Sequence, residues 1–485
     1  MNKKPHFLIQ FVLILVAFTA ILLQGFTHVV KMKPLAGYVP DEQPVDLSFK
    51  TYYDGTFQNY LTDHAKRNSG FREPCIRIYN QCLFSLFSKP TNNTLVPGLN
   101  KEMYFQIYLD EIKGKTLKDC YGSEECFKTK AQKDIEKTLV LIDSLRQHNT
   151  AFLVVEAPSK TWVYPEYMPQ EYQDSIMSFC VQDYYTQLFK ENGIPHIDFL
   201  SYFKSLKGKT KYPLYTRYGT HWAESTIPFV ADSILSKIGS LIGQEMPHII
   251  CVDENLTTQY SKQDGELEAL MNLLLPIRKP AIPQPIMTVS DTTLCKPNIL
   301  VIADSYFVQL QESCFADCFD RCEYWQYNDE IITKDIEFLG KVATYPDAYK
   351  VINEVDMVLV ISTSVFAYNY LFGFCETVPK AREMEIQNTI QRIKSTPAWL
   401  ENVKQQAIER GVDLDEILRL NAIYAMEVDK KNEQQLQDVI KRIKNTPEWL
   451  ENVKHQAKEK NISLNEMLRL NATYAIETDK QKQQN

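Results

Sequence analysis

The sequence has no surplus of positive charge, no second long hydrophobic run and no even number of cysteines, and each absence narrows the range of functions. Its 485 residues carry 53 Lys and Arg against 61 Asp and Glu, a formal net charge of −8. Nonspecific nucleic-acid binding needs a basic surface that neutralises phosphates. We therefore expect no nucleic-acid partner. The chain is also too long for one ordinary hydrophobic core, which predicts more than one folded unit.

The one long hydrophobic run lies at the N-terminus. Lys3 and Lys4 precede residues 7–30, which are mostly apolar, and about 20 apolar residues are enough to span a bilayer. No small-x-small cleavage motif follows directly, so a retained anchor fits better than a removed signal peptide. We predict a single-pass anchor in the cell membrane at 1–33 and a linker at 34–49, with the bulk of the protein facing the periplasm or the cell exterior.

The eleven cysteines cannot all pair internally, because their number is odd. Cys120 and Cys126 flank a short polar loop and could form a local disulfide. Cys314, Cys318 and Cys322 recur every fourth residue, which predicts one stripe of a helix. Three thiols without a nearby His are a weak zinc signature. We interpret the stripe as buried apolar packing and predict neither a metal nor a cofactor.

The middle of the chain alternates short apolar segments with segments of helical periodicity. The expected strands are 151–156, 194–199, 298–303 and 355–361, and the expected helices are 130–147, 172–192 and 224–241. Short buried strands that alternate with helices indicate a parallel sheet covered on both faces. The sequence therefore predicts an α/β domain.

The last hundred residues contain an internal repeat. Residues 386–429 and 436–479 align without gaps at a period of 50, and 27 of the 44 aligned positions are identical, which is a strong repeat signal. Each copy contains Thr-Pro-x-Trp-Leu-Glu-Asn-Val-Lys, in which Thr caps a helix and Pro occupies its first turn. We predict an all-α tandem repeat with units at 383–430 and 433–480, and an interaction role for it.

The strongest chemical signal is the apolar strand that ends in Asp304-Ser305. A strand end places the serine hydroxyl at the carboxyl edge of a parallel sheet, where ligand sites form in α/β proteins. Backbone N–H groups just after such a serine can stabilise a developing oxyanion. The competing interpretation is an ordinary helix N-cap.

Two further segments carry polar residues that suit chemistry. His221 precedes Trp222 at the boundary between a loop and a helix, where an imidazole can act as general base to a serine on another strand end. A packed structural pair is the alternative for these two residues. Lys160 lies in a loop after a strand, so its cation can face inward.

In this order, the three segments resemble the SGNH-like domain of the alginate O-acetyltransferase family, the AlgJ and AlgX type. The resemblance covers about residues 50–375. It implies an SGNH-hydrolase-like (flavodoxin-like) parallel sheet for a domain at 50–378, followed by a tandem repeat that is not typical of the family. The matching blocks are Pro158-Ser-Lys160 with Tyr164-Pro-Glu166, then Arg217-Tyr-Gly-Thr-His221-Trp222, then Ala303-Asp-Ser305-Tyr306.

The resemblance implies acetyl transfer to an exported or cell-envelope polysaccharide. His221 would remove the hydroxyl proton of Ser305, an acetyl-enzyme would form, and a sugar hydroxyl would then attack it. Members of this family work with a membrane-bound O-acyltransferase that passes acetyl groups across the membrane. The predicted anchor would keep the domain close to such a donor.

Four more residues are candidates for substrate binding. Lys160 and Arg217 are expected either to contact an acidic sugar or to form structural ion pairs. Trp222 and Trp325 are expected either to stack on sugar rings or to pack in the core.

The sequence departs from the family pattern at Gly219, where the family has the Asp that orients the imidazole. Three interpretations follow. Another carboxylate substitutes, with Asp304, Glu224 and Asp232 as candidates. Alternatively, the enzyme runs as a Ser-His dyad. In the third, the domain is a catalytically silent glycan-binding or scaffold subunit. Among active enzymes, a carbohydrate esterase that passes the acetyl group to water is the alternative to a transferase.

Overall fold

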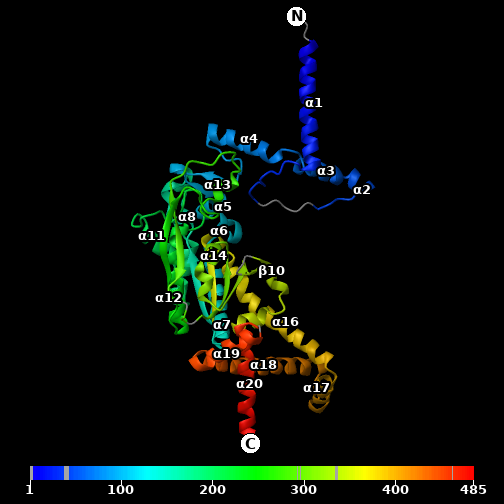
Figure 1. The fold of residues 1–485 in the computed structure, drawn as a ribbon, viewed down its shortest axis with the longest axis vertical. Coiled ribbons are helices and arrows are strands. Elements are labelled where there is room, and N and C mark those ends of the chain that lie inside the picture. The colour runs from blue at the N-terminus through cyan, green and yellow to red at the C-terminus, as the bar shows by residue number, and fades with distance from the viewer. Residues whose placement is uncertain are drawn as a thin grey trace. The chain divides into compact units, whose positions relative to one another are not determined.

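The computed structural model describes residues 4–37, 43–291, 293–294, 296–333, 337–460 and 462–484. The predicted linker at 34–49 therefore falls partly outside the described residues. The chain divides into two units, and Figure 1 shows both strands and helices in the first unit and helices in the second. The first unit is Met1–Thr344 with Lys350–Cys375, and the second is Tyr345–Tyr349 with Glu376–Asn485.

A seven-stranded sheet forms the centre of the first unit, in the order β10-β9-β8-β7-β11-β3-β4. The five strands from β8 to β4 are parallel, and β9 and β10 add an antiparallel edge. The four strands expected from the sequence all occur, and the α/β fold class is confirmed. The strands are β3 Ala151–Ala157, β4 His196–Asp198, β7 Asn298–Ala303, β8 Arg321–Gln326, β9 Glu330–Ile332, β10 Phe338–Lys341 and β11 Met357–Thr363.

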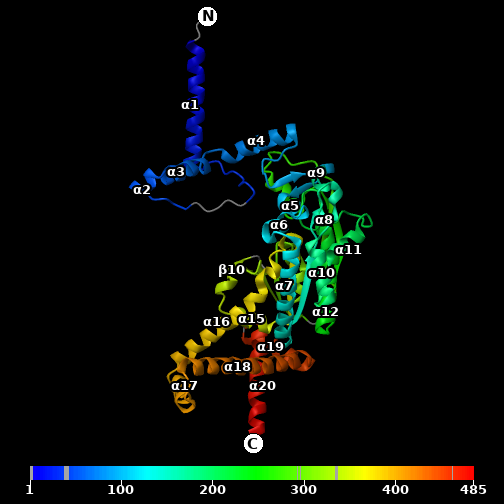
Figure 2. The ribbon, with the colours of Figure 1, turned by 180° about the vertical axis from the view of Figure 1, so that it is seen from behind.

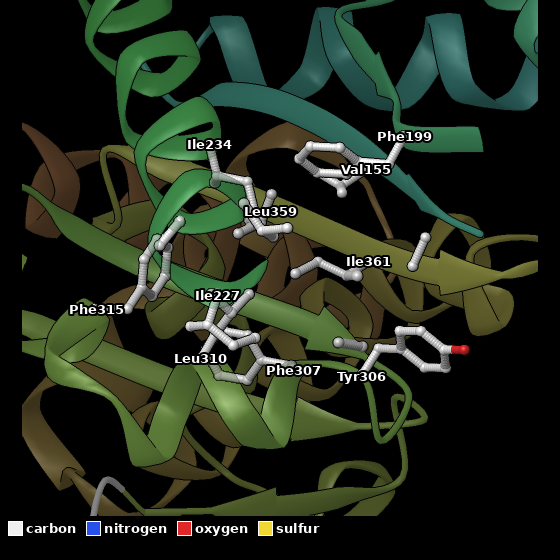
Figure 3. Close-up of a cluster of buried hydrophobic side chains, with 14 of the residues drawn as sticks. Val155, Phe199, Ile227, Ile234, Tyr306, Phe307, Leu310, Phe315, Leu359 and Ile361 are labelled. Atoms are coloured by element: carbon white, nitrogen blue, oxygen red, sulfur yellow. The ribbon is translucent and has the colours of Figure 1, made fainter. Parts of the chain in front are cut away.

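Alternate side chains of the parallel strands build the core on one face of the sheet. Figure 3 shows part of this cluster, in which α12 (Ile227–Ile242) and α14 (Phe307–Glu312) pack near Leu359 and Ile361 of β11. Each buried side chain of this size contributes about 1.5–3 kcal/mol. The strand side chains between them point to the opposite face, where α7 (Glu124–Arg146) contacts β3. Helices therefore cover both faces.

The cysteines do not form the predicted helical stripe. A 3₁₀ turn begins at Cys314 and ends at Cys318. Cys322 lies on β8, whose residues 321–326 pair with β7. All three nevertheless pack in or against the same apolar core. Cys120 and Cys126 are free and exposed, so no local disulfide joins them.

The N-terminal part is helical. Of the described helices, α1 (Lys4–Thr27) is long and apolar enough to cross a membrane over Phe7–Thr27, a property that anchors and signal sequences share. Three helices follow: α2 (Phe49–Tyr53), α3 (Thr56–Arg67) and α4 (Arg72–Phe87). Figure 2 shows the turn between α3 and α4 at the C-terminal end of α1.

The second unit contains two equivalent helical cores. The long helix α18 contributes its first half to one core and its second half to the other. Val403 and Val453, 50 residues apart, are completely buried at matching positions. The Thr396 hydroxyl donates to the Arg392 carbonyl and does not cap the next helix as expected. The helices are α16 Phe374–Ser395, α17 Pro397–Arg410, α18 Leu414–Lys444, α19 Pro447–Lys460 and α20 Leu464–Gln484.

Candidate active site

The position of Ser305 is set by the buried carboxylate of Asp304, the residue before it. Asp304 Oδ1 accepts a hydrogen bond from the Tyr306 backbone N–H at 2.9 Å, and Oδ2 accepts from the backbone N–H and hydroxyl of Thr363, both at 2.8 Å. These bonds join the ends of the neighbouring strands β7 and β11. They leave Asp304 without a bond to His221, so it is not the orienting carboxylate. The Tyr306 N–H is also occupied and is no oxyanion donor here.

His221 lies between a hydroxyl and a carboxylate. Its Nε2 is 2.9 Å from Ser305 Oγ, and its Nδ1 is 2.9 Å from Glu266 Oε1. An ionised carboxylate can only accept hydrogen bonds, so Nδ1 carries the hydrogen and donates it to Glu266. Nε2 is then free to accept the hydrogen of the Ser305 hydroxyl. Ser305 and His221, both predicted from the sequence, are therefore in contact. Glu266, which was not predicted, completes the group.

The pKa of His221 is set by two opposing influences. Burial of the imidazole lowers its pKa, but the charge of Glu266 and its hydrogen bond outweigh burial, and the pKa stands above its ordinary value. The His221 side chain is 8% exposed and that of Glu266 is 21% exposed. The ion pair that forms when the imidazole takes up a proton is therefore largely shielded from water.

Glu266 opens the short helix α13 (Glu266–Leu270) and is held against the loop that carries His221. The Thr220 N–H donates to Glu266 Oε1 at 2.8 Å, and the Leu267 N–H donates to the Tyr218 carbonyl at 2.8 Å. Glu266 was not predicted from the sequence, because it follows His221 by 45 residues and belongs to no motif. The one local signal is an acidic residue in the first turn of a short helix.

Gly219 has no room for the side chain that the family pattern expects. A Cβ atom there would lie 2.7 Å from Thr216 Oγ1 and 2.9 Å from the Gln263 carbonyl oxygen. Contacts below 3.0 Å are too short for a real Cβ, so an Asp at 219 would displace the loop. The segment that would collide with it is the one that leads to Glu266.

The other two proposed partners of His221 are engaged elsewhere. The carboxylate of Glu224 interacts with Ser261, and burial is the first cause of its raised pKa. Asp232 Oδ1 is 2.7 Å from His248 Nδ1 at an exposed position. The prediction that Asp304, Glu224 or Asp232 orients the imidazole is therefore wrong for all three.

Asp264 is a second acid close to His221. Burial, followed by the charge of Glu224, raises its pKa to about 8. Its Oδ1 accepts from the Glu224 N–H at 3.3 Å, and its carbonyl accepts from the Thr216 hydroxyl at 2.5 Å. These two hydrogen bonds hold the loop that presents Glu266.

Lys160 is a structural cation. Its side chain is 3% exposed, and its ammonium lies 2.8 Å from Glu102 Oε2. It also donates to the carbonyls of Met103, Thr216 and Arg217, at 2.8–3.1 Å. All its protons are used inside the protein, so it cannot contact a sugar. The side chain of Arg217 is 41% exposed, with Nε 4.0 Å from Glu102 Oε1, and it remains available.

Trp222 and Trp325 are completely buried. Trp222 packs edge-to-face on Tyr306 with ring centroids 5.1 Å apart, and Trp325 Nε1 donates to Glu323 Oε1 at 2.8 Å. Neither ring has a free face, so the predicted stacking on sugar rings is wrong. The alternative, core packing, holds for both.

Two phenols interact with the charge of Asp304, the residue before Ser305. Burial, and next the charge of Asp304, raise the pKa of Tyr327, while hydrogen bonds with the hydroxyl and backbone of Ser305 partly oppose that rise. Tyr108 is buried, and burial holds its pKa well above the ordinary value; its phenol hydrogen-bonds with Thr363. Both phenols therefore stay protonated at neutral pH and can donate.

Residues 123–293 match the family model "SGNH hydrolase-like domain, acetyltransferase AlgX". The match confirms the resemblance and the SGNH-like fold. His221 and Glu266 lie inside the matched range, and Ser305 follows it by 12 residues. No curated protein matches the sequence.

Two solved structures are among those similar to the chain. The O-acetyltransferase domain of Pseudomonas putida AlgJ has 13% identity and a TM-score of 0.37, and the match covers 60% of this chain and 100% of that one. Pseudomonas aeruginosa AlgX has 12% identity and a TM-score of 0.36, over 58% of this chain and 67% of that one.

Proposed function

We propose that this protein is an O-acetyltransferase that acetylates an exported or cell-envelope polysaccharide through an acetyl-serine at Ser305. The observation that carries the proposal is the continuous chain of hydrogen bonds from Ser305 through His221 to Glu266. A nucleophile, a base and an orienting carboxylate in that order are the parts that acyl transfer requires. The match to an acetyltransferase domain supports acetyl as the group that is transferred.

The first half-reaction loads the enzyme. Ser305 Oγ attacks the carbonyl carbon of the acetyl donor while His221 Nε2 takes the hydroxyl proton. The tetrahedral intermediate collapses, the bond to the donor's leaving group breaks, and His221 returns the proton to that group. Glu266 holds the ring and stabilises the imidazolium between the two steps.

The second half-reaction transfers the acetyl group from Ser305 to the acceptor. His221 removes the proton of a sugar hydroxyl, whose oxygen attacks the acetyl carbon of acetyl-Ser305. Collapse gives an O-acetyl sugar, and the proton returns to Ser305 Oγ. The protonated Tyr327 phenol, which hydrogen-bonds with Ser305, is the candidate donor to the developing oxyanion.

The N-terminal helix supports a location for this reaction at the cell membrane. The apolar, exposed α1 would anchor the catalytic domain in the cell membrane, with the domain facing the periplasm or the cell exterior. There it would receive acetyl groups from a membrane-bound O-acyltransferase. The half-exposed Arg217 is the remaining candidate contact for an acidic sugar.

The experiment is to incubate the full chain with p-nitrophenyl acetate and look for acetyl on Ser305 by mass spectrometry. Ser305→Ala should abolish the adduct and lower ester turnover by about 10³-fold or more. Ser233→Ala, which removes a hydroxyl bonded within α12, is the matched control and should behave as wild type.

Equal turnover by wild type and Ser305→Ala, with no adduct, would leave the silent glycan-binding or scaffold subunit as the function. If the adduct forms, assays with polysaccharide acceptors distinguish a transferase from a carbohydrate esterase. A transferase gives O-acetylated polysaccharide, whereas a carbohydrate esterase gives only acetate.

A further inference from the structure

Helix α4 is seated against the protein on one side and exposes apolar side chains on the other. On the inner side, Asn80 Nδ2 donates to the Met271 carbonyl at 2.9 Å, and Phe84 packs against a buried cluster that includes Leu267. On the outer side, the exposed residues recur at helical spacing and are almost all apolar. The apolar ones are Cys75, Ile78, Tyr79, Cys82, Leu86 and, at the end, Phe87, and the exposed polar one is Ser85. A helix that is seated on one side and apolar on the other lacks a partner on its outer face.

The two preceding helices also leave apolar side chains without a partner among the described residues. On α3, Phe57, Tyr60 and Leu61 lie on one face, and no residue of α3 is buried by the part of the chain that the structure describes. On α2, Phe49 and Tyr53 stack on each other at 6.0 Å while both remain more than 80% exposed. We call α2, α3 and α4, residues 49–87, the platform.

The platform is joined to α1 by a close backbone contact. A Cβ at Gly25 of α1 would lie 2.7 Å from the Asn68 carbonyl oxygen, and a Cβ at Gly70 would lie 2.9 Å from the Gly25 nitrogen. Only glycine permits this approach on both sides. The side chain of Gln24 is buried beside it and bonds both backbone groups of Val30. The platform is therefore held at the C-terminal end of α1.

We infer that the platform lies in the surface layer of the membrane that α1 spans, with its exposed apolar side chains inserted among the lipids. The inference rests on the anchor role proposed for α1. Helices with one apolar and one polar face insert to about 5–10 Å, at the boundary between headgroups and acyl chains. Tyrosine rings favour this depth, because the ring is apolar and the hydroxyl polar.

Charge favours a lipid occupant over a protein one. Residues 28–89 carry eight Lys and Arg against six Asp and Glu, whereas the whole chain is at −8. A locally basic segment at the end of a span is attracted to anionic headgroups. Three successive helices with exposed apolar side chains, at the end of one apolar helix, also form a broader surface than a single docking groove needs.

The test uses the full chain in nanodiscs made with lipids brominated near the headgroup end of the acyl chains. The five native tryptophans all follow residue 161, so wild type provides the background emission. Leu61→Trp and Tyr79→Trp place a probe on the apolar faces of α3 and α4. Asn59→Trp on the polar face of α3 is the matched control, and Leu15→Trp in α1 reports insertion of the span.

Brominated lipid should remove about half or more of the emission added at 61, 79 and 15, and little of that added at 59, given the insertion depth of interfacial helices. Quenching at 15 without quenching at 61 and 79 would overturn the inference and leave the anchor intact. Cross-linking of Cys75 or Cys82 between copies would then identify a second copy as the occupant. No quenching at 15 would overturn both, while the adduct on Ser305 tests the chemistry separately.

Discussion

At the scale of single residues, the protonation and orientation of His221 depend on one carboxylate. Glu266 accepts from Nδ1 and raises the pKa of the imidazole against the opposite influence of burial. Removal of its charge should therefore act on both the rate and its pH dependence.

Glu266→Gln should lower ester turnover by about 10²–10⁴-fold, because the amide no longer stabilises the imidazolium and can select the wrong tautomer. The general base must be neutral, so activity rises with pH through the pKa of His221. With the charge gone, that pKa falls, and the acid limb of the kcat/KM profile should move to lower pH. Stopped-flow assays from pH 4 to 9, with about 1-unit steps, measure both effects.

Asp232→Asn is the control for Glu266→Gln, because its carboxylate pairs with His248 at the surface. It should leave the profile unchanged. An unchanged acid limb in Glu266→Gln would mean that Glu266 has no orienting role and that the enzyme runs as a Ser-His dyad.

Gly219→Asp should not create a better triad. Its Cβ would collide with Thr216 and with the Gln263 carbonyl, so we expect a loss of about 1–3 kcal/mol in the free energy of unfolding. Gly219→Ala introduces the same atom and should show most of the loss in thermal denaturation. Recovery of turnover in the double variant Gly219→Asp with Glu266→Gln would contradict this account.

Sequence reasoning located Ser305 and His221 because each follows a recognisable local pattern, a strand end and a loop before a helix. It missed Glu266 because that contact is made through space across 45 residues. It left open whether Lys160 and the two tryptophans contact the substrate or are buried, because burial depends on tertiary packing, which no local pattern of residues contains.

At the scale of elements, the site depends on loops that leave the carboxyl ends of the strands. Apolar runs predicted β3, β7 and β11 because these strands are buried on both faces. β8 was missed because Arg321, Glu323 and Gln326 interrupt its apolar pattern. The loops themselves are joined by Lys160, which links the Glu102-Met103 segment to the loop before His221.

Lys160→Met should therefore destabilise the fold and leave substrate affinity alone. The change leaves Glu102 and three backbone carbonyls without their partner, and loss of one member of a buried ion pair costs about 3–5 kcal/mol. Denaturant titration measures this loss. Lys207→Met, which breaks the exposed pair with Glu166, should cost at most about 1 kcal/mol. A raised KM with unchanged stability in Lys160→Met would instead indicate contact with the substrate.

At the scale of the whole molecule, the proposed catalytic residues and the helical repeats occupy different units. Ser305, His221 and Glu266 all belong to the first unit, and the equivalent cores of the repeats belong to the second. We therefore expect the repeats to serve an interaction, such as complex formation or acceptor targeting, and not the chemical step.

A chain that ends at residue 382 should keep ester turnover within about twofold of wild type, because the deletion removes no residue that touches the site. It should lose complex formation, because the repeats are absent. The cut must follow Phe374, which is completely buried and packs edge-to-face on Trp325 with centroids 6.4 Å apart. A chain that ends at residue 373 is the matched comparison, and loss of this ring should cost about 3–5 kcal/mol. If the chain ending at 382 is as unstable as the shorter one, the repeats support the fold of the catalytic unit and are not a separable interaction module.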